Sequence, residues 1–446
     1  MERNLTKGSI TINILLFALP LMLGNLLQQM YNIADTWVVG RFLGSKALAA
    51  VGSSYALMIF LTSIILGLCM GCSAGISMDY GSKEYSKMRQ NIFMSFILIG
   101  IISVALNILV YVFMDFILWF LQIPIEIQPL IKDYLNIIFI GIIATFLYNY
   151  FANILRAIGN SITPLVFLSL SAILNVILDL VCVLILHWGV KGAAIATVFS
   201  QFISGIGITA YTIIKFPQLR PNKNDMHWNK HNLHTIFNLS VLTSLQQSIM
   251  NFGILMVQGL VNSFGTVIMA AFASAVKIDS FAYMPVQDFG NAFSTYVAQN
   301  YGAGKRERIE KGIKSAIITV SIFCLIISSL VFIFAKPLME IFIEPTEIEI
   351  IKAGIKYLRI EGACYIGIGI LFLLYGFYRA INKPSMSLIL TIASLGTRVA
   401  LAYLLSSISF IGVTGIWLSV PIGWALADII GILFYFKSKK LRDCQF

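Results

Sequence analysis

Charged residues are scarce in this chain of 446 residues. Asp, Glu, Lys and Arg together make up 11% of the sequence, and only 20 residues are acidic. Because a soluble globular domain carries about 25% charged residues, this composition excludes a chain that exposes its whole surface to water. Hydrophobic residues instead supply 58% of the sequence, and the mean hydropathy is +0.87. These values indicate a polytopic membrane protein.

Residues that serve metal and redox chemistry are also few. The sequence has 4 histidines and 6 cysteines. Cys69 and Cys72 form a Cys-x-x-Cys pair, but it lies in an apolar run with no second pair or histidine nearby. We therefore interpret these two cysteines as buried small residues and not as a zinc or redox site.

Sequence motifs for catalysis are missing as well. Gly304 and Lys305 lack the upstream glycine and the following hydroxyl residue of a phosphate-binding loop, which argues against ATP hydrolysis. Asp179 has no Gly-x-Gly before it, which argues against an intramembrane aspartyl protease. We expect a protein that is not an enzyme and that needs no cofactor.

Basic residues outnumber acidic ones and give a formal net charge of +11. They lie in short loops and not on one folded face, which favours the lipid bilayer over nucleic acid as a partner. If the N-terminus is cytoplasmic, the cytoplasmic segments hold 21 Lys and Arg residues and the outer segments hold 7. Since Lys and Arg prefer cytoplasmic loops, we predict a cell-membrane protein with both termini in the cytoplasm.

The apolar runs predict an all-α polytopic membrane protein with twelve transmembrane helices in two six-helix lobes. The lobes are residues 1–214 and 234–446, and a polar cytoplasmic linker, residues 215–233, separates them. The spans are predicted at residues 12–38, 47–77, 91–114, 132–154, 162–186, 190–213, 234–262, 265–297, 313–335, 349–377, 384–405 and 411–436.

The two halves resemble each other in sequence. Residues 155–159 (LRAIG) match residues 378–382 (YRAIN), and residues 189–192 (GVKG) match residues 412–415 (GVTG), both at an offset of 223. Two earlier matches, 80–82 with 301–303 and 27–29 with 245–247, have offsets of 221 and 218. An even number of spans per half keeps the same topology, so the lobes are parallel, pseudo-symmetric repeats with the transport pathway between them.

One carboxylate stands in the first apolar run. Gly24, Gln28, Tyr31 and Asp35 are spaced 4, 3 and 4 residues apart, which places them on one face of a helix. A charge at mid-bilayer costs roughly 2.5–3.5 kcal/mol, so an acid there indicates a functional site. Pro20 precedes this face and removes a backbone hydrogen bond, which predicts a hinge. At an offset of 218, the second half has glycine in place of Asp35.

A second acid of the first half, Asp179, follows Asn175 by four residues and shares its helix face. Thr197 lies on the sixth span, and Asn149 and Asn153 form another pair at this spacing on the fourth. Carboxylate, amide and hydroxyl oxygens suit a small hard cation, and two acids in a medium of low dielectric constant also suit a shared proton. An interhelical hydrogen-bond network explains the Asn and Thr residues as well, but explains two acids without a nearby base less readily.

Charges of both signs occur in the spans of the second half. Because both signs are available, we expect ion pairs there in place of an ion-binding site. Asp288 is also a candidate for attracting a cationic substrate. The ionisable residues in these spans are Lys277, Asp279, Asp288, Arg359, Glu361, Arg398 and Asp428.

The chain resembles the multidrug and toxic compound extrusion (MATE) family over all twelve spans. The resemblance rests on Pro20 and on residues 28–36 (QQMYNIADT), 155–160 (LRAIGN), 175–179 (NVILD) and 192–197 (GAAIAT). It implies two lobes around a V-shaped central cavity and multidrug efflux: the export of bulky, often cationic small molecules by antiport with H⁺ or Na⁺. We also expect a monomer.

The resemblance also implies roles for individual residues. The cation or proton site, with Na⁺ as one candidate ion, comprises Asp35, Asn175, Asp179 and Thr197, while its polar surroundings comprise Gln28, Tyr31, Asn149 and Asn153. Some branches of the family place acids on spans seven and ten, but here only Glu361 does so, on span ten, so a second ion site is not expected. The alternative is a lipid-linked precursor flippase of the same superfamily. The acids that accompany the few membrane cations disfavour it.

Overall fold

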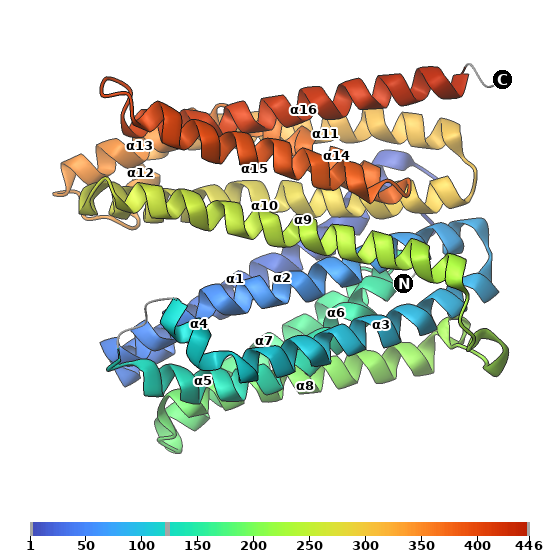
Figure 1. Ribbon diagram of the computed structural model, residues 1–446, viewed down its shortest axis with the longest axis horizontal. Coiled ribbons are helices and arrows are strands. Elements are labelled where there is room, and N and C mark those ends of the chain that lie inside the picture. Colours follow the sequence, from blue (N-terminus) through green and yellow to red (C-terminus); the bar gives the residue numbers. More distant parts are fainter. Residues whose placement is uncertain (1–2, 121–124, 444–446) are drawn as a thin grey trace. The chain divides into compact units, whose positions relative to one another are not determined.

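The computed structural model describes residues 3–120 and 125–443, and Cys444 lies outside this range. Throughout the described residues the regular structure is helical, and each of the twelve predicted spans falls on a helix or on a pair of helices, which confirms the all-α fold (Figure 1). In the first half these elements are α1 (Ile10–Leu43), α2 (Ser45–Ser82), α3 (Tyr85–Val112), α4 (Met114–Phe120), α5 (Gln128–Ile140), α6 (Ile142–Ala157), α7 (Ile162–Leu180), the π-helix η1 (Val181–Ile185) and α8 (Gly189–Lys215).

The second half repeats this order of elements. Its helices are α9 (Lys230–Asn262), α10 (Thr266–Gly302), α11 (Arg306–Ile333), α12 (Ala335–Glu340), α13 (Ile348–Gly362), α14 (Tyr365–Ala380), α15 (Pro384–Ser406) and α16 (Val413–Asp443). The short 3₁₀ helices η2 (Pro217–Leu219) and η3 (Lys223–Asp225) lie between the halves.

Two of the spans are broken at equivalent places in the repeat. The pairs α5/α6 and α13/α14 are bent by 41° and 51°. At the first bend, a Cβ on Gly141 would lie 2.9 Å from the backbone carbonyl oxygen of Ile138, so a larger residue there would require a shift of the backbone. The second bend follows Gly362.

The number of membrane spans follows from these elements. By length and hydropathy, nine helices of the described chain could cross a membrane, and eleven if each bent pair is one span. α9 has the length of a span, 33 residues, but is not among them. Its amide side chains lower its hydropathy, and they are Asn232, Asn238, Gln246, Gln247, Asn251, Gln258 and Asn262.

The described chain forms two compact units that differ from the predicted lobes. Unit 1 comprises Met1–Leu5 and Leu19–Ser244, and unit 2 comprises Thr6–Ala18 and Leu245–Phe446. The first part of α1 thus packs with unit 2, and the first part of α9 packs with unit 1. The sequence analysis also predicted a V-shaped cavity between the two lobes, and this cavity stays a prediction.

Close backbone contact fixes the first part of α9 in unit 1. A Cβ on Gly71 of α2 would lie 2.2 Å from the Leu239 carbonyl oxygen, and one on Gly67 would lie 2.4 Å from Ser244 Cα. Ser244 Oγ also donates to the carbonyl oxygen of Ile64 at 2.9 Å. Small residues one turn apart let membrane helices approach this closely, and here they hold α9 against α2.

Hydrogen bonds hold residues 6–18 in unit 2. Lys305 Nζ donates to the carbonyl oxygen of Thr6 at 2.7 Å, and Arg308 donates to that of Gly8 at 3.0 Å. The hydroxyls of Thr11 and Ser315 lie 2.7 Å apart, which joins α1 to α11. The first part of α1 therefore packs in unit 2, just as the first part of α9 packs in unit 1.

The linker between the repeats is held on unit 1 by a buried carboxylate. Asp225 accepts hydrogen bonds from Arg89 at 2.6 Å and from Ser86 at 2.8 Å. These bonds, with that of Arg89 the strongest, lower the pKa of Asp225 to about 2.

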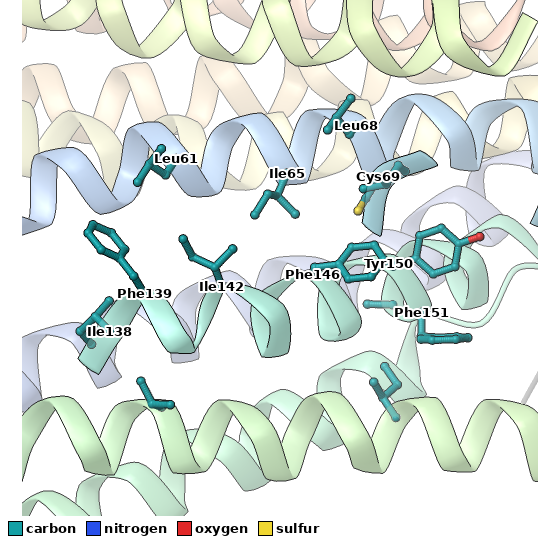
Figure 2. Packing of buried hydrophobic residues seen from close by; sticks show 14 of the residues in the cluster. Leu61, Ile65, Leu68, Cys69, Ile138, Phe139, Ile142, Phe146, Tyr150 and Phe151 are labelled. Carbon is teal, nitrogen blue, oxygen red and sulfur yellow. The ribbon is translucent and has the colours of Figure 1, made fainter. Parts of the chain in front are cut away.

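The apolar interior of unit 1 lies between α2 and the bent pair α5/α6. Figure 2 shows Leu61, Ile65 and Leu68 of α2 opposite Phe139 of α5 and Phe146 of α6. Cys69 and Cys72 are buried, free thiols in this region, as the sequence predicted. The packing fixes α5, which contributes one wall of the site described next.

Candidate functional site

Two carboxyl groups meet inside unit 1. Asp35 projects from α1, and Asp179, whose exposed fraction is 0%, projects from the last turn of α7. The two side chains lie within hydrogen-bonding distance of each other. Two carboxylates both accept hydrogen bonds and repel each other, so a proton or a cation between them would stabilise this contact. The structure thus brings together the two acids that the sequence singled out.

Asn175 links Asp179 to α8. With both ends of its amide satisfied, the nitrogen donates to Asp179 Oδ2 at 3.0 Å, and the oxygen accepts from the hydroxyl and the main-chain N–H of Thr197, at 3.2 and 3.3 Å. Asn175 and Thr197 are both buried. Asn175 therefore presents a donor to the carboxyl pair, while its oxygen is engaged by Thr197.

Two tyrosines border the pair. Tyr31 of α1 interacts with both carboxyls and hydrogen-bonds to Thr197. Tyr134 of α5, with an exposed fraction of 3%, interacts with Asp35, Asp179 and Tyr31. The sequence analysis missed Tyr134 because it lies on the apolar face of its helix. Its repeat equivalent at an offset of 223, Tyr357, was a signal that could have revealed it.

A helical irregularity follows Asp179 directly. The π-helix Val181–Ile185 continues α7, and Trp188 N–H donates to the carbonyl oxygen of Cys182 at 3.0 Å. π-Helical turns are rare and occur frequently at functional sites, because they turn side chains away from regular helical positions. Asp179 is held at the junction of the two helix types.

The donor set of this site fits a small hard cation or a proton. Oδ1 of Asp35 and Oδ1 of Asp179 are buried and have no hydrogen-bond partner among the described residues. Hard cations prefer such carboxylate oxygens. No group of three or more His, Cys, Asp or Glu side chains in the described chain forms a metal site, so a bound metal ion would depend on the two acids and neutral oxygens.

Other predicted residues lie apart from the pair or are used locally. Gln28 is exposed, and Pro20 is half-buried inside the continuous helix α1. Asn149 and Asn153 each donate to a carbonyl oxygen one turn earlier in α6, at 2.9 and 2.8 Å. Asp288 is buried in α10 of unit 2. The structure places Tyr31 beside the pair, and the roles predicted for these five residues stay predictions.

Unit 2 holds a second pair of acids, which the sequence analysis did not expect. Asp279 of α10 and Glu361 of α13 lie within hydrogen-bonding distance of each other and are both buried. Tyr365 donates to Asp279 Oδ1 at 2.6 Å, and Tyr357 donates to Glu361 Oε2 at 2.9 Å. The tertiary packing therefore places acid beside acid, and Arg398 acts electrostatically on both. The ion pairs expected in this half stay a prediction.

Comparisons with known proteins agree with this architecture. The family model MatE matches residues 20–181 and 240–404, well over half of the chain. The probable multidrug resistance protein YpnP of Bacillus subtilis is 29% identical over 435 residues, covering 96% of each chain. The probable multidrug resistance protein NorM of Thermotoga maritima is 26% identical over 434 residues, covering 95% of this chain and 91% of its own.

A solved structure shows the same fold. The crystal structure of MATE in the bent conformation superimposes with a TM-score of 0.92 at 24% identity, covering 99% of this chain and 98% of that one. Its similarity spans both repeats. The family match and the helical architecture together establish that the chain belongs to the MATE family of multidrug efflux transporters, and that it is a membrane transporter and not an enzyme.

Proposed function

We propose that this transporter exports bulky, often cationic compounds by antiport, and that the ion driving export, H⁺ or Na⁺, binds at the Asp35–Asp179 pair. The observation that carries the proposal is the buried contact of two carboxyls to which the described residues supply no Lys or Arg. An acid pair without a basic partner is costly inside a membrane and indicates a functional site. A cation or proton from solution supplies the missing positive charge.

The charge of the pair decides which state of unit 1 is favoured. With both carboxyls ionised, their repulsion and their loss of hydration oppose a closed, dry site. One proton shared between them leaves one negative charge, and a second proton or one Na⁺ neutralises that charge. Asn175 then holds the neutral pair by a hydrogen bond to Asp179 that needs no water. Ion binding therefore favours a drier site.

α1 connects this site to the rest of the molecule. It belongs to unit 2 up to Ala18 and to unit 1 from Leu19, and Pro20 stands two residues beyond this boundary. Proline has no N–H to donate to the preceding turn, so the helix bends at low cost there. We place a hinge at Pro20, through which neutralisation of Asp35 changes the substrate-binding cavity.

Ion and substrate then favour different conformations. Antiport follows as a coupling free energy between the two ligands, and each must weaken the binding of the other by the same factor. We place both termini in the cytoplasm, on the basis of the excess of Lys and Arg in the alternate loops. We also propose that the protein acts in the cell membrane as a monomer. Organic cations are the substrate class, with Asp288 and the polar residues Gln28, Asn149 and Asn153 along the cavity.

Efflux from proteoliposomes tests this proposal. Purified protein is reconstituted with ethidium, and export is followed by fluorescence under an imposed pH gradient alone or a Na⁺ gradient alone. We expect one of the two gradients to drive ethidium against its own concentration gradient. Transport that proceeds equally without either gradient would contradict antiport, and protein-free liposomes provide the background.

A further inference from the structure

The linker between the repeats covers one end of unit 1, where α3 begins and α8 ends (Figure 1). Its 3₁₀ helices η2 and η3 pack against α3, and η2 also packs against α8. Phe216 and Leu219 are buried there, with exposed fractions of 8% and 4%. The carboxylate of Asp225 binds Arg89 of α3. This end of unit 1 is therefore covered by a segment that supplies both an apolar part and an anion.

The repeat places equivalent helix ends in unit 2. α11 corresponds to α3 at an offset of 221, and α14 corresponds to α6 at an offset of 223, because the bounds of each pair differ by these values at both ends. α16 corresponds to α8, since residues 412–415 match residues 189–192 at the offset of 223.

The two units differ in the chain that follows these helices. At the offset of 223, the last residue of α8, Lys215, corresponds to Ser438, but α16 continues as a helix to Asp443. The described chain after α16 therefore does not turn back over the start of α11, as the linker does over α3. Residues 6–11 contact α11 on another face, at Arg308 and Ser315.

A cavity of about 190 Å³ lies at this place, between the end of α10, the start of α11, the end of α14, and α16. Its apolar lining comprises Ile309, Ile313, Phe377 and Ile381. The counterpart of Ile313 in unit 1 is Ile92, whose exposed fraction is 5%, whereas Ile313 is half-buried. The same apolar position is thus more exposed in unit 2.

The size of the cavity limits what it holds. Sites for drug-sized ligands measure about 300–1,000 Å³, and an apolar cavity of about 150 Å³ holds benzene. The cavity of unit 2 therefore has room for a section of an alkyl chain but not for a bulky export substrate. Because its lining is mostly apolar, a free inorganic anion would lose its hydration there without compensation.

Basic residues predominate at the rim of the cavity. Residues 301–314, which form its α10–α11 side, include five basic and two acidic residues. Arg306 lines the rim and is exposed, and its Nε lies 3.9 Å from Glu310, which makes a long and weak ion pair. Lys383, in the turn between α14 and α15, stands over the ring of Phe434 at 5.2 Å. An anion at the rim therefore meets a net positive environment.

We propose that this cavity binds an anionic phospholipid, with part of an acyl chain between Ile309 and Phe377 and the phosphate at Arg306. The lipid supplies in unit 2 the apolar part and the anion that the linker supplies in unit 1. Tyr301 and Tyr435 also line the cavity, and tyrosine is enriched where membrane proteins meet the headgroups. Basic pockets between membrane helices on the cytoplasmic side bind anionic headgroups.

The choice of leaflet rests on the cytoplasmic termini proposed above, which place the cavity in the cytoplasmic leaflet. The binding itself depends neither on that orientation nor on the ion that drives export.

Native mass spectrometry of the purified full-length protein tests the proposal, because it resolves each bound lipid by its mass. Delipidated protein is titrated with palmitoyl-oleoyl phosphatidylglycerol or with the zwitterionic palmitoyl-oleoyl phosphatidylcholine, which has the same acyl chains. We expect one molecule of phosphatidylglycerol to bind about 5-fold more tightly than phosphatidylcholine, or more. Inorganic phosphate in about 100-fold excess should not displace the lipid, since the acyl chain supplies part of the affinity.

Three variants separate charge from packing. Arg306→Gln should weaken phosphatidylglycerol binding about 5-fold and leave phosphatidylcholine binding unchanged. Glu310→Gln removes a negative charge from the same rim and should strengthen phosphatidylglycerol binding. Ile309→Trp fills the cavity and should abolish the tight site without changing its charge. Lys223→Gln removes an exposed charge from η3 in unit 1 and is the matched control, which should retain binding.

Equal affinity for the two lipids, or tight binding in Ile309→Trp, would overturn the proposal, because only lipid that adheres to the apolar surface without a specific site would remain. Weaker binding in Glu310→Gln would overturn it as well, and so would displacement by phosphate, which would assign the rim to a free anion. If Ile309→Trp is not monodisperse, Ile313→Phe takes its place. Binding in detergent is measured without transport, so failure of the efflux experiment would leave these results unchanged.

Discussion

Asn175 and Asp179 stand one helical turn apart in α7, and the amide nitrogen of Asn175 donates to Asp179 Oδ2 at 3.0 Å while its oxygen accepts from Thr197. This chain of hydrogen bonds joins α7 to α8 and fixes the orientation of the Asp179 carboxyl toward Asp35. A buried network of polar side chains keeps a single arrangement when each of its groups has a hydrogen-bond partner. The orientation of the acid pair is therefore set by residues that carry no charge.

Replacing Asp35 by Asn keeps the shape of the side chain and removes its charge. We expect uphill ethidium export to fall about 10-fold or more, since a typical coupling free energy of 1–3 kcal/mol corresponds to 5–150-fold. The measurement is the initial efflux rate from proteoliposomes under the driving gradient. Asp133→Asn, which removes a half-buried acid paired with Lys191, is the matched control and should retain the rate. Unaltered uphill export by Asp35→Asn would remove this residue from the coupling mechanism.

Asp35 and Asp179 should act as a single site. Residues in contact show interaction energies of about 0.5–3 kcal/mol, so the double variant Asp35→Asn/Asp179→Asn should lose less ion affinity than the sum of the single variants. Ion binding to purified protein gives these energies. Asp35→Asn combined with Asp288→Asn, a buried acid of unit 2, provides the control and should be additive within about 0.5 kcal/mol. Strict additivity for Asp35 and Asp179 would assign them to separate sites.

The hinge can be tested separately from the ion site. Pro20→Ala restores the backbone N–H and should favour a straight α1, so ion affinity should persist while the mutual weakening of ion and substrate binding decreases. Substrate affinity in detergent, with and without saturating ion, measures the effect. Pro285→Ala alters a proline inside α10, which lies wholly in unit 2, and should leave the coupling intact. Equal coupling in Pro20→Ala and the wild type would exclude the hinge.

The glycine contact between α2 and α9 should be sensitive to a single methyl group. Because a Cβ on Gly71 would lie 2.2 Å from the Leu239 carbonyl oxygen, Gly71→Ala should destabilise the protein by about 1–3 kcal/mol. Gly52 lies in the same helix with nothing within 4 Å of its Cβ position. Gly52→Ala should therefore stabilise α2 by roughly 0.5–1 kcal/mol. Thermal unfolding in detergent should move in opposite directions for the two variants, and a shared direction would contradict this packing.

The linker should loosen in acid. The folded-state pKa of Asp225, about 2, is below its ordinary value of about 3.9, so its contribution to stability is fully present at neutral pH. This contribution is lost as the pH falls from about 4 through about 2, because the carboxyl is then protonated and releases Arg89. Asp225→Asn should show a smaller loss of thermal stability than the wild type over this range. At pH 7 the variant should also be cut faster by trypsin within residues 217–230, and identical cleavage would argue against this attachment of the linker.

The amino-acid sequence by itself determined the helical architecture. Span length and hydropathy are properties of single segments, so most of the spans could be placed without knowing how they pack, while α9 was placed by the sequence repeat. The same holds for the repeat and for Asp35 and Asp179, because an isolated acid in an apolar run is visible in one dimension. Pro20 was likewise evident from its position inside a helix.

Only the tertiary structure decided which side chains meet. Tyr134 joins the acid pair, and Asp279 meets Glu361, because the rotation and depth of each helix bring distant residues together. Hydrophobic periodicity gives a helix face but not the partner of that face, so the meeting of two acids in unit 2 could not be predicted from either helix alone. The exchange of the first parts of α1 and α9 was equally hidden, since it depends on backbone contact at Gly67 and Gly71, which no property of α9 alone reveals.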